Sequence, residues 1–424
     1  MPFEIALTGL NASSADLSII GNNIANSATH GFKESRGEFA DIFAVSNLGT
    51  SQNAIGQGVQ LANVAQQFTQ GNLSFTDNPL DLAVSGEGFF RLNENGSSVY
   101  SRAGQFHADR QGFIVNNQGQ RLTGFLANAS GTITGALGDL QINSANIAPA
   151  GTATVDLALN MDANAPIIAS AFNSTDPSTY NHSTSATIYD SLGNGLLATT
   201  YYRRTAANTW ASYLYVTPPG GTPIEIIPDD GSPTSGEFAT LTFNNAGGLA
   251  SATPVGSVVP SSVNYSAASL AAVTGAANLD LELRYAGTTQ YGSAFTVASL
   301  TQDGYPTGRL SSIDIEQDGT MFGRFTNGQS QVLGQVALAN FNSVAGLRNL
   351  GDTSWAETFD SGAPLTGAPG TGTLGLVQSG ALEESNVDLS EQLVNLITAQ
   401  RNFQANAQVI SAADQVTQTI INIR

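Results

Sequence analysis

Apolar side chains recur at steps of three and four residues at both ends of this chain, which is the period of one face of a helix. The N-terminal stripe predicts a helix about 30 Å long. We expect it to end within residues 22–31, because asparagine and glycine favour helix termination there. The positions of this stripe are Phe3, Ala6, Leu10, Leu17, Ile20 and Ile24, with Ser13 as its one weak position.

The second stripe lies near the C-terminus, where no proline or glycine occurs between Val387 and Arg424. Asn386 and the neighbouring serines are N-cap candidates, and Asp388 and Glu391 fall in the first turn, where the helix dipole favours acidic groups. The pattern predicts a helix on the order of 50 Å long. Its apolar positions are Leu389, Leu393, Leu396, Phe403, Ala407 and Ile410, interrupted by Gln400.

Neither helix is expected to be stable alone in water, so each stripe needs a partner, and the two stripes are obvious partners for each other. One interpretation is a two-helix hairpin that ties the ends of one domain together. The other is a coiled-coil foot that completes its packing only against neighbouring subunits. A row of amides on the second helix favours the foot, with Gln404 and Gln408 as candidates to line a channel. These amides are Gln400, Asn402, Gln404, Asn406, Gln408, Gln415, Gln418 and Asn422.

Between the helices the pattern changes to short apolar runs separated by turns, which is typical of β-strands. Asn95-Gly96 joins two such runs as a hairpin signal, and residues 311–341 have the same character. Residues 148–295 are rich in Ala, Thr, Ser and Gly and indicate an inserted β domain. The predicted fold is therefore mixed and mainly β, with nested discontinuous β domains and N- and C-terminal α-helices that form a coiled-coil foot.

This nesting predicts four layers, and each layer except the innermost is split between the two halves of the chain. A chain of this kind brings its termini together and places its middle elsewhere. The predicted layers are a terminal helical assembly domain (1–28 and 386–424), an extended connector (29–72 and 352–385), a β-rich body domain (73–147 and 296–351) and an inserted outer β domain (148–295).

Composition narrows the classes of function. The 424 residues carry a formal charge of -19 without a basic patch, which argues against nucleic acid and anionic membrane surfaces as partners. No apolar run is long enough for membrane insertion, and the N-terminus lacks the basic and apolar regions of a cleavable signal peptide. The absence of cysteine excludes disulfides, thiolate metal sites and thiol nucleophiles.

Signals for catalysis or ligand binding are weak, so we expect no enzyme activity and no catalytic, cofactor or metal site. His30, His107 and His182 lie far apart, without a metal-binding spacing. Residues 370–375 match G-x-G-x-x-G by letter, but no strand pattern precedes them, so we expect a glycine-rich linker. Asp229-Asp230 stands between a proline and a glycine and is expected to form a turn rather than half of a catalytic pair.

Two long stretches carry a family resemblance. GLNASSADLSIIGNNIANSATHGFKESRGEFADIF, residues 9–43, resembles the N-terminal signature of the bacterial flagellar axial family of rod and hook proteins, and residues 380–410 resemble its C-terminal signature. Residues 80–92 and 100–106 look like the first body domain of that family. The resemblance implies that the signature positions act in packing and in contact between subunits. They are Asn22, Asn23, Asn26, Gly31, Phe32, Asn386, Val387, Asp388, Gln400, Arg401 and Asn406.

The length of the chain and residues 39–43 favour the hook branch of this family. The resemblance then implies a flexible hollow tube outside the cell, in the flagellar hook next to the basal body, which acts as a universal joint and transmits torque from rod to filament. The implied partners are further copies of the chain in a helical homopolymer, the distal rod protein, the hook-filament junction protein and the hook cap. Export would use the flagellar type III apparatus, without signal cleavage.

Three alternatives remain open at this point. A distal rod subunit of the flagellar basal body shares both signatures. A secreted β-rich carbohydrate-binding protein or hydrolase would share the low charge, but it would not need matching helical stripes at both termini. An adhesin should be a stable monomer with formed terminal helices, whereas a hook subunit is expected to have largely disordered termini before assembly.

Overall fold

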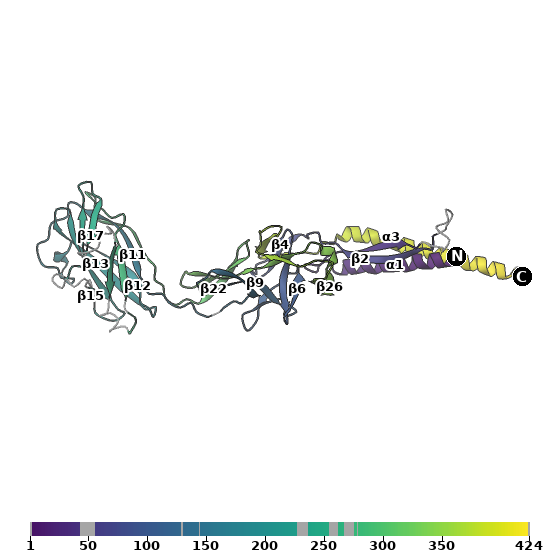
Figure 1. Ribbon diagram of the computed structural model, residues 1–424. Coiled ribbons are helices and arrows are strands. Elements are labelled where there is room, and N and C mark those ends of the chain that lie inside the picture. The colour runs from purple at the N-terminus through teal and green to yellow at the C-terminus, as the bar shows by residue number, and fades with distance from the viewer. Residues whose placement is uncertain are drawn as a thin grey trace. The chain divides into compact units, whose positions relative to one another are not determined.

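The structure is a computed structural model, and it describes residues 2–42, 56–128, 130–143, 145–226, 236–253, 262–266, 275–277 and 279–422. The chain separates into two compact units. Unit 1 comprises Met1–Ser144, Ser311–Arg324 and Ser330–Arg424, and unit 2 comprises Ala145–Leu310 and Phe325–Gln329. Strands make up most of the regular structure and a long helix lies at each end of the chain (Figure 1), so the predicted fold class is confirmed.

The two long helices belong to unit 1 and pack against each other within the single chain, which differs from the largely disordered termini expected of a hook subunit before assembly. Helix α1 (Pro2–Ala25) has 24 residues, and helix α3 (Leu389–Asn422) has 34 residues. A β-hairpin formed by β1 (Ser35–Asp41) and β2 (Val59–Gln66) lies along α1 (Figure 1). These three elements, α1, α3 and the β1–β2 hairpin, form one region of unit 1, which we call the foot.

The remainder of unit 1, which we call the body, is built on one large sheet of 13 strands and two short strand pairs. Its strands are β3 (Leu73–Phe75), β4 (Leu82–Ser85), β5 (Phe89–Glu94), β6 (Ser97–Ser101), β7 (His107–Ala108), β8 (Ile114–Val115), β9 (Arg121–Ala127), β10 (Ile133–Asp139), β22 (Leu310–Ile315), β23 (Thr320–Phe325), β24 (Ser330–Val336), β25 (Leu338–Asn340), β26 (Arg348–Gly351), β27 (Ser354–Ala356), β28 (Leu365–Gly367), β29 (Leu376–Ser379) and β30 (Ala381–Glu383).

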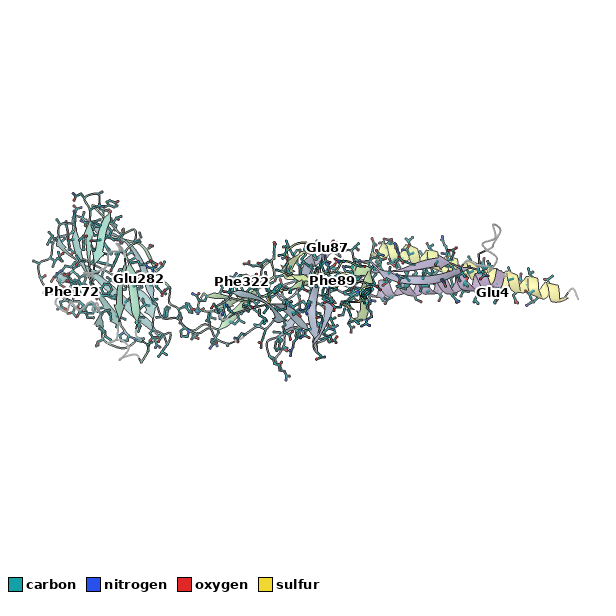
Figure 2. All side chains as sticks on the ribbon, in the orientation of Figure 1. Glu4, Glu87, Phe89, Phe172, Glu282 and Phe322 are labelled. Atoms are coloured by element: carbon teal, nitrogen blue, oxygen red, sulfur yellow. The ribbon has the colours of Figure 1, made fainter. Side chains whose placement is uncertain are left out.

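Strands from both halves of the chain alternate within this sheet. The main path runs β22-β23-β24-β9-β5-β6-β27-β26, so β9, β5 and β6 lie between strands that come more than 200 residues later. Aromatic rings from both halves meet edge to face in the core, where Phe89 lies 5.7 Å from Trp355 and Tyr100 lies 4.8 Å from Phe341 (Figure 2 labels Phe89). The body cannot form its core until both halves of the chain are present.

The segments expected to be extended connectors are extended, but they are also paired. β3 pairs with β30 and β4 with β29, and β27 and β28 join the body sheet beside β6 and β25. A backbone buried beside other chain segments needs hydrogen-bond partners, and strand pairing supplies them. These residues therefore form part of the body and the foot, rather than a separate linker layer.

Unit 2 contains two sheets. One has the strand order β18-β19-β11-β20 with β21 beside β11, and the other has the order β12-β13-β14-β16-β17 with β15 beside β14. The strands are β11 (Thr154–Asp162), β12 (His182–Tyr189), β13 (Gly195–Ala206), β14 (Thr209–Thr217), β15 (Ile224–Ile226), β16 (Ala239–Phe243), β17 (Leu249–Thr253), β18 (Ser262–Ser266), β19 (Asp280–Arg284), β20 (Thr289–Tyr291) and β21 (Thr296–Gln302).

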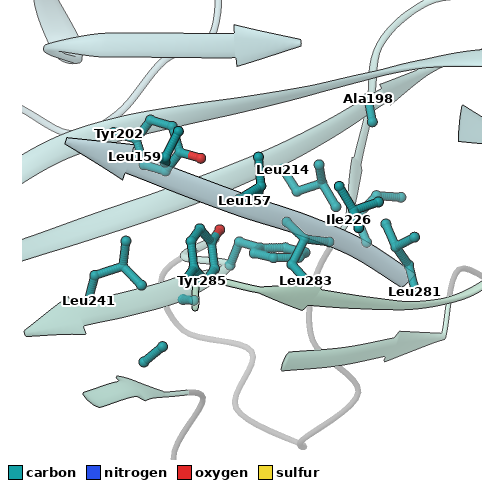
Figure 3. Packing of buried hydrophobic residues seen from close by; sticks show 14 of the residues in the cluster. Leu157, Leu159, Ala198, Tyr202, Leu214, Ile226, Leu241, Leu281, Leu283 and Tyr285 are labelled. Carbon is teal, nitrogen blue, oxygen red and sulfur yellow. The ribbon is translucent and has the colours of Figure 1, made fainter. Parts of the chain in front are cut away.

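The core of unit 2 lies between these two sheets. Leu157 and Leu283 from the first sheet pack in one cluster with Tyr202, Leu214 and Leu241 from the second (Figure 3). Residues 296–310, which the sequence pattern assigned to the body, belong to unit 2, because β21 pairs antiparallel with β11 along its length. The observed boundary of unit 2 therefore differs from the predicted one. The partner of a strand depends on tertiary contacts, which apolar periodicity does not reveal.

Candidate assembly surface

The contact between α1 and α3 follows a heptad seam. On α1, Ala6, Ser13 and Ile20 are buried at steps of seven, and Leu10, Leu17 and Ile24 are half-buried at the same step. Alternating steps of four and three are the pattern of helices that pack side by side over several turns. The α3 residues least exposed within their turns are Gln392, Leu396, Ala399, Phe403, Asn406, Ile410 and Ala413.

Two close contacts fix how the helices meet. A side chain at Gly9 would come within 2.7 Å of the Asn406 Oδ1 atom, so glycine permits the close approach of the helices there. At the other end of α1, Asn23 Nδ2 donates to Gln392 Oε1 at 3.3 Å. Both pairs of residue numbers add up to the same value, so the helices run antiparallel in one register from Gly9 to Asn23.

The structure separates the predicted apolar positions of α3 into two groups. Leu396, Phe403 and Ile410 are half-buried toward α1. Leu389 and Leu393 were expected in the same stripe, but they remain 47% and 45% exposed. The seam instead passes through Gln392, which is 2% exposed. Gln392 can be buried there because its side-chain amide forms hydrogen bonds with Asn23 and Glu34. A seam position occupied by a polar residue cannot be predicted from the spacing of apolar residues.

The exposed apolar residues form a second set on α3, distinct from the seam. Four of them lie in the first turns of the helix and two lie toward its end, and α1 does not cover them. This set consists of Leu389, Leu393, Val394, Ile397, Val409 and Val416. Gln400, Arg401, Gln404 and Gln408, which were predicted assembly or channel positions, are likewise exposed.

Asparagines tie the ends of both helices to the hairpin. Asn23 is 1% exposed, its Nδ2 donates to Ser35 O at 2.8 Å and its Oδ1 accepts from Ser35 N at 3.0 Å. Asn26 closes the end of α1 on the carbonyl of Asn22, which accepts from Asn26 N at 3.1 Å and from Asn26 Nδ2 at 2.9 Å. Asn22 itself is exposed. The Asn-rich stretch thus terminates the helix and also anchors the strand that follows.

The C-terminal signature makes matching contacts. Asn386 Oδ1 accepts from Glu34 N at 2.8 Å, and Asn386 Nδ2 donates to Gln67 O at 2.8 Å. Asp388 caps α3, since its Oδ1 accepts from the backbone N–H of Ser390 at 2.8 Å. Val387, between these two residues, is half-buried.

A buried ionic cluster, which the sequence analysis did not assign, joins foot and body. Lys33 Nζ lies 2.6 Å from Glu383 Oε1, and Arg102 Nη1 lies 3.2 Å from Glu383 Oε2, with 0%, 5% and 0% of the Lys33, Arg102 and Glu383 side chains exposed. Burial lowers the pKa of Lys33, and the adjacent Glu383 carboxylate acts in the opposite direction. The one available signal was that Lys33 is the sole lysine of the chain.

Backbone groups complete this cluster. Lys33 Nζ also donates to Thr69 O at 2.7 Å, Arg102 Nη2 donates to Gly86 O at 2.9 Å, and Gly71 N donates to Glu383 Oε1 at 3.0 Å. Each of the three charged side chains therefore has a hydrogen-bond partner besides its ion pair, as buried charges require, and only Arg102 Nε is buried without one.

Gly31 brings the N-terminal segment into contact with this cluster. Its φ of 71° lies in the left-handed region, and a Cβ there would come within 2.5 Å of Ala103 N. Gly31 N donates to the carbonyl of Glu383 at 2.8 Å. Phe32 is half-buried and lines a cleft of about 400 Å³, which Asn22, Asn26 and Trp355 also line. Glycine is required here for both backbone conformation and space.

The described residues offer no metal-binding cluster. They contain no group of three His, Asp or Glu side chains placed to hold a metal ion. Residues 370–375 form a turn between β28 and β29, closed by Gly370 N donating to Gly375 O at 2.9 Å, so they do not open a helix. Asp229-Asp230 lies outside the described residues. No helix in the described ranges combines the length and apolar character needed to span a membrane.

Comparisons with known proteins agree along the whole chain. Four family models match it: "Flagella basal body rod protein" at residues 3–33, "Flagellar hook protein FlgE/F/G D1 domain" at 83–156, "Flagellar basal body protein FlaE D2 domain" at 159–305 and "Flagellar basal body rod FlgEFG protein C-terminal" at 378–423. These matches follow the order foot, body, unit 2 and foot.

Full-length relatives carry a single description. The chain is 40% identical to the flagellar hook protein FlgE of Salmonella typhimurium and 32% identical to that of Borreliella burgdorferi. The alignments cover 100% of both chains in the first case, and 99% of this chain and 98% of the relative in the second. The crystal structure of the flagellar hook protein FlgE2 of Helicobacter pylori shares the fold, with a TM-score of 0.52 and 15% identity over 73% of this chain and 100% of that chain.

Proposed function

This chain belongs to the flagellar hook protein family, and on that premise we propose that it polymerises through its foot into a hollow, flexible tube that couples rod to filament. The family is one of structural proteins of the flagellar hook. We infer that the working contacts are between copies of the chain, and that no step of chemistry is involved.

The observation that carries this proposal is the uncovered apolar set on α3. Six Leu, Ile and Val side chains between Leu389 and Val416 are 45% to 63% exposed on one helix. Burying the exposed half of such a side chain stabilises an assembly by roughly 1 kcal/mol. Exposed apolar side chains in this number on one long helix are typical of an interface, and neighbouring copies of α3 would cover them.

The remaining predicted contacts follow from the same arrangement. We infer that Gln404 and Gln408, both exposed amides, face the channel, where they offer neither an apolar surface nor a fixed charge. The distal rod protein, the hook-filament junction protein and the hook cap are the proposed partners at the ends of the tube. We further propose export through the flagellar type III apparatus without signal cleavage, and a location outside the cell.

Unit 2 supplies the proposed sliding contacts of a bending tube. Two chain segments lead into it side by side, with isolated bridges between Ile147 and Gly308 and between Ala150 and Tyr305. Removing residues 152–303 and joining the ends by a two-residue glycine-serine loop would keep these bridges. We expect this deletion variant to form tubes with abnormal curvature, and electron microscopy of isolated hooks that showed normal curvature would contradict the role assigned to unit 2.

The absence of cysteine allows a direct test of the location. Thr222 is exposed in the segment between β14 and β15 of unit 2, and the Thr222→Cys variant carries a single thiol because the chain has no cysteine of its own. In a hookless strain of a flagellated bacterium, an impermeant maleimide dye should label this variant on intact cells, in spots at the base of each flagellum. Labelling that required permeabilisation of the outer membrane would indicate a rod subunit, and dye on soluble protein in the medium alone would favour a secreted β protein.

A further inference from the structure

A groove in the foot contains one ionisable side chain. The groove has a volume of about 680 Å³, and α1, the β1–β2 hairpin and α3 all contribute to its walls. Most of its lining is apolar or amide, including Ile5, Ala12 and Phe39, and Asp16 is the only charged residue in it. A carboxylate among such neighbours is costly to leave without a counter-charge.

Asp16 has no counter-charge among the residues that the structure describes. None of the ion pairs or hydrogen bonds formed by residues of the described ranges includes its carboxylate, and no basic residue lies within one turn of it on α1. Partial burial raises the pKa of Asp16, with no neighbouring cation to act against that effect. The charge in this groove is therefore uncompensated in the single subunit.

The foot also carries one cation without an ion-pair partner, on the side of α3 that faces away from α1. Arg401 is the only Lys or Arg between residues 384 and 423, its side chain is exposed, and it forms no ion pair with any residue that the structure describes. Two residues of helix correspond to a rotation of about 200°, so Arg401 points away from the seam that contains Ala399 and Phe403. Ile397, one turn earlier, is part of the uncovered apolar set.

We propose that Arg401 of one copy enters this groove and pairs with Asp16 of a neighbouring copy. Complementary patches on different faces of one chain give a head-to-tail contact, which extends into an open polymer rather than closing into a dimer. In a chain with a formal charge of -19, copies repel one another, so a single well-placed cation directs the contact. A guanidinium also matches a carboxylate in geometry better than an ammonium does.

This inference rests on the proposed function, since it names one contact within the homopolymer. The test is a charge-reversal cycle on the full chain: Asp16→Arg, Arg401→Asp and the double variant. The critical concentration for polymer formation would be measured by sedimentation, and circular dichroism would check that each monomer keeps the parent's helix content. We expect each single variant to raise the critical concentration at least about tenfold and the double variant to return it to within about threefold of the parent.

Matched controls separate pairing from nonspecific charge effects. Arg36→Asp reverses another exposed arginine of the foot, one that already pairs with Glu38, and it should neither raise the critical concentration comparably nor be corrected by Asp16→Arg. If Asp16→Arg reduces the helix content of the monomer, Asp16→Asn, Arg401→Gln and their double variant form a second cycle that neutralises the charges instead of reversing them. Two single-variant defects that simply add in the double variant would overturn the pair while leaving the proposed function intact. A parent chain that formed no polymer and built no hooks would refute the proposed function and the pair together.

Discussion

Glu383 neutralises two buried cations, and its replacement is the most informative single perturbation of unit 1. In Glu383→Gln, Lys33 and Arg102 would remain buried with no anion in contact, since both now rely on that one carboxylate. In Lys33→Met, by contrast, Glu383 and Arg102 would remain a balanced pair. Both variants remove the Lys33–Glu383 pair, but Glu383→Gln also removes the Arg102–Glu383 pair and leaves the cluster with a net positive charge.

The expected magnitudes follow from that difference. Removing one member of a buried ion pair costs about 3–5 kcal/mol, and two stranded cations place Glu383→Gln at about 5 kcal/mol. Lys33→Met removes one of the two donors to the carbonyl of Thr69 and leaves Asn386 Nδ2 at 3.3 Å, so the loss should cost no more than about 1–3 kcal/mol. We therefore expect the free energy of unfolding of unit 1 to fall by at least about 2 kcal/mol more in Glu383→Gln than in Lys33→Met.

The two tryptophans make it possible to measure unit 1 separately. Trp355 lies in the core of unit 1 and Trp210 in that of unit 2, and both are buried. In a Trp210→Phe background, fluorescence in urea reports only the unfolding of unit 1. All variants would be compared in this background, so the effect of Trp210→Phe on unit 2 cancels.

A surface ion pair provides the control. Arg324 and Asp314 lie 2.6 Å apart, but their side chains are 61% and 49% exposed, so Asp314→Asn should change the free energy of unfolding by at most about 1 kcal/mol. If Glu383→Gln destabilised unit 1 no more than Lys33→Met does, stranded charge would not be the source of the effect, and the reasoning would be refuted.

Three further predictions concern other parts of the chain. Burial raises the pKa of Tyr285 to about 12, so the unfolded chain releases this proton first and the free energy of unfolding of unit 2 should fall by about 1 kcal/mol by pH 11. Trp210 fluorescence in urea would measure this in a Trp355→Phe background, with Tyr285→Phe as reference. Leu393→Asp should keep the helix content of the monomer but prevent polymer formation, whereas Leu396→Asp in the seam should reduce both, as circular dichroism and sedimentation would show. Replacing Gln404 and Gln408 by leucine should slow filament growth in cells without preventing hook assembly, and unchanged growth rates would contradict a channel position.

The terminal helices could be predicted because their apolar period is local. Steps of three and four from Phe3 to Ile24 define α1 to within a few residues of Pro2–Ala25, and the absence of Pro and Gly after Val387 predicts the length of α3. The register between them could not be predicted, because Gln392 and Asn406 occupy seam positions as amides. Hydrogen bonding decides those positions, and apolarity does not.

The ionic cluster could not be predicted from the sequence, for a different reason. Lys33, Arg102 and Glu383 lie in three separate segments, and nothing near any of them indicates burial. Strand partners could not be predicted either. β5 and β27 belong to one sheet although they lie far apart in the sequence, and the sequence boundary of unit 2 depends on the pairing of β21 with β11. Local pattern predicts that an element exists, but long-range contacts determine what it touches.

The contact between Lys33 and Glu383 also determines how late in synthesis this part of unit 1 can fold. The two residues are 350 positions apart, so a ribosome that adds about 5–20 residues per second completes the pair tens of seconds after Lys33 emerges. During that interval α1 has no seam partner, and the N-terminal segment has no fixed docking site on the body. A growing chain is thereby kept open until its last fifty residues exist, which leaves time for a chaperone or a translocation channel to engage it before the foot closes.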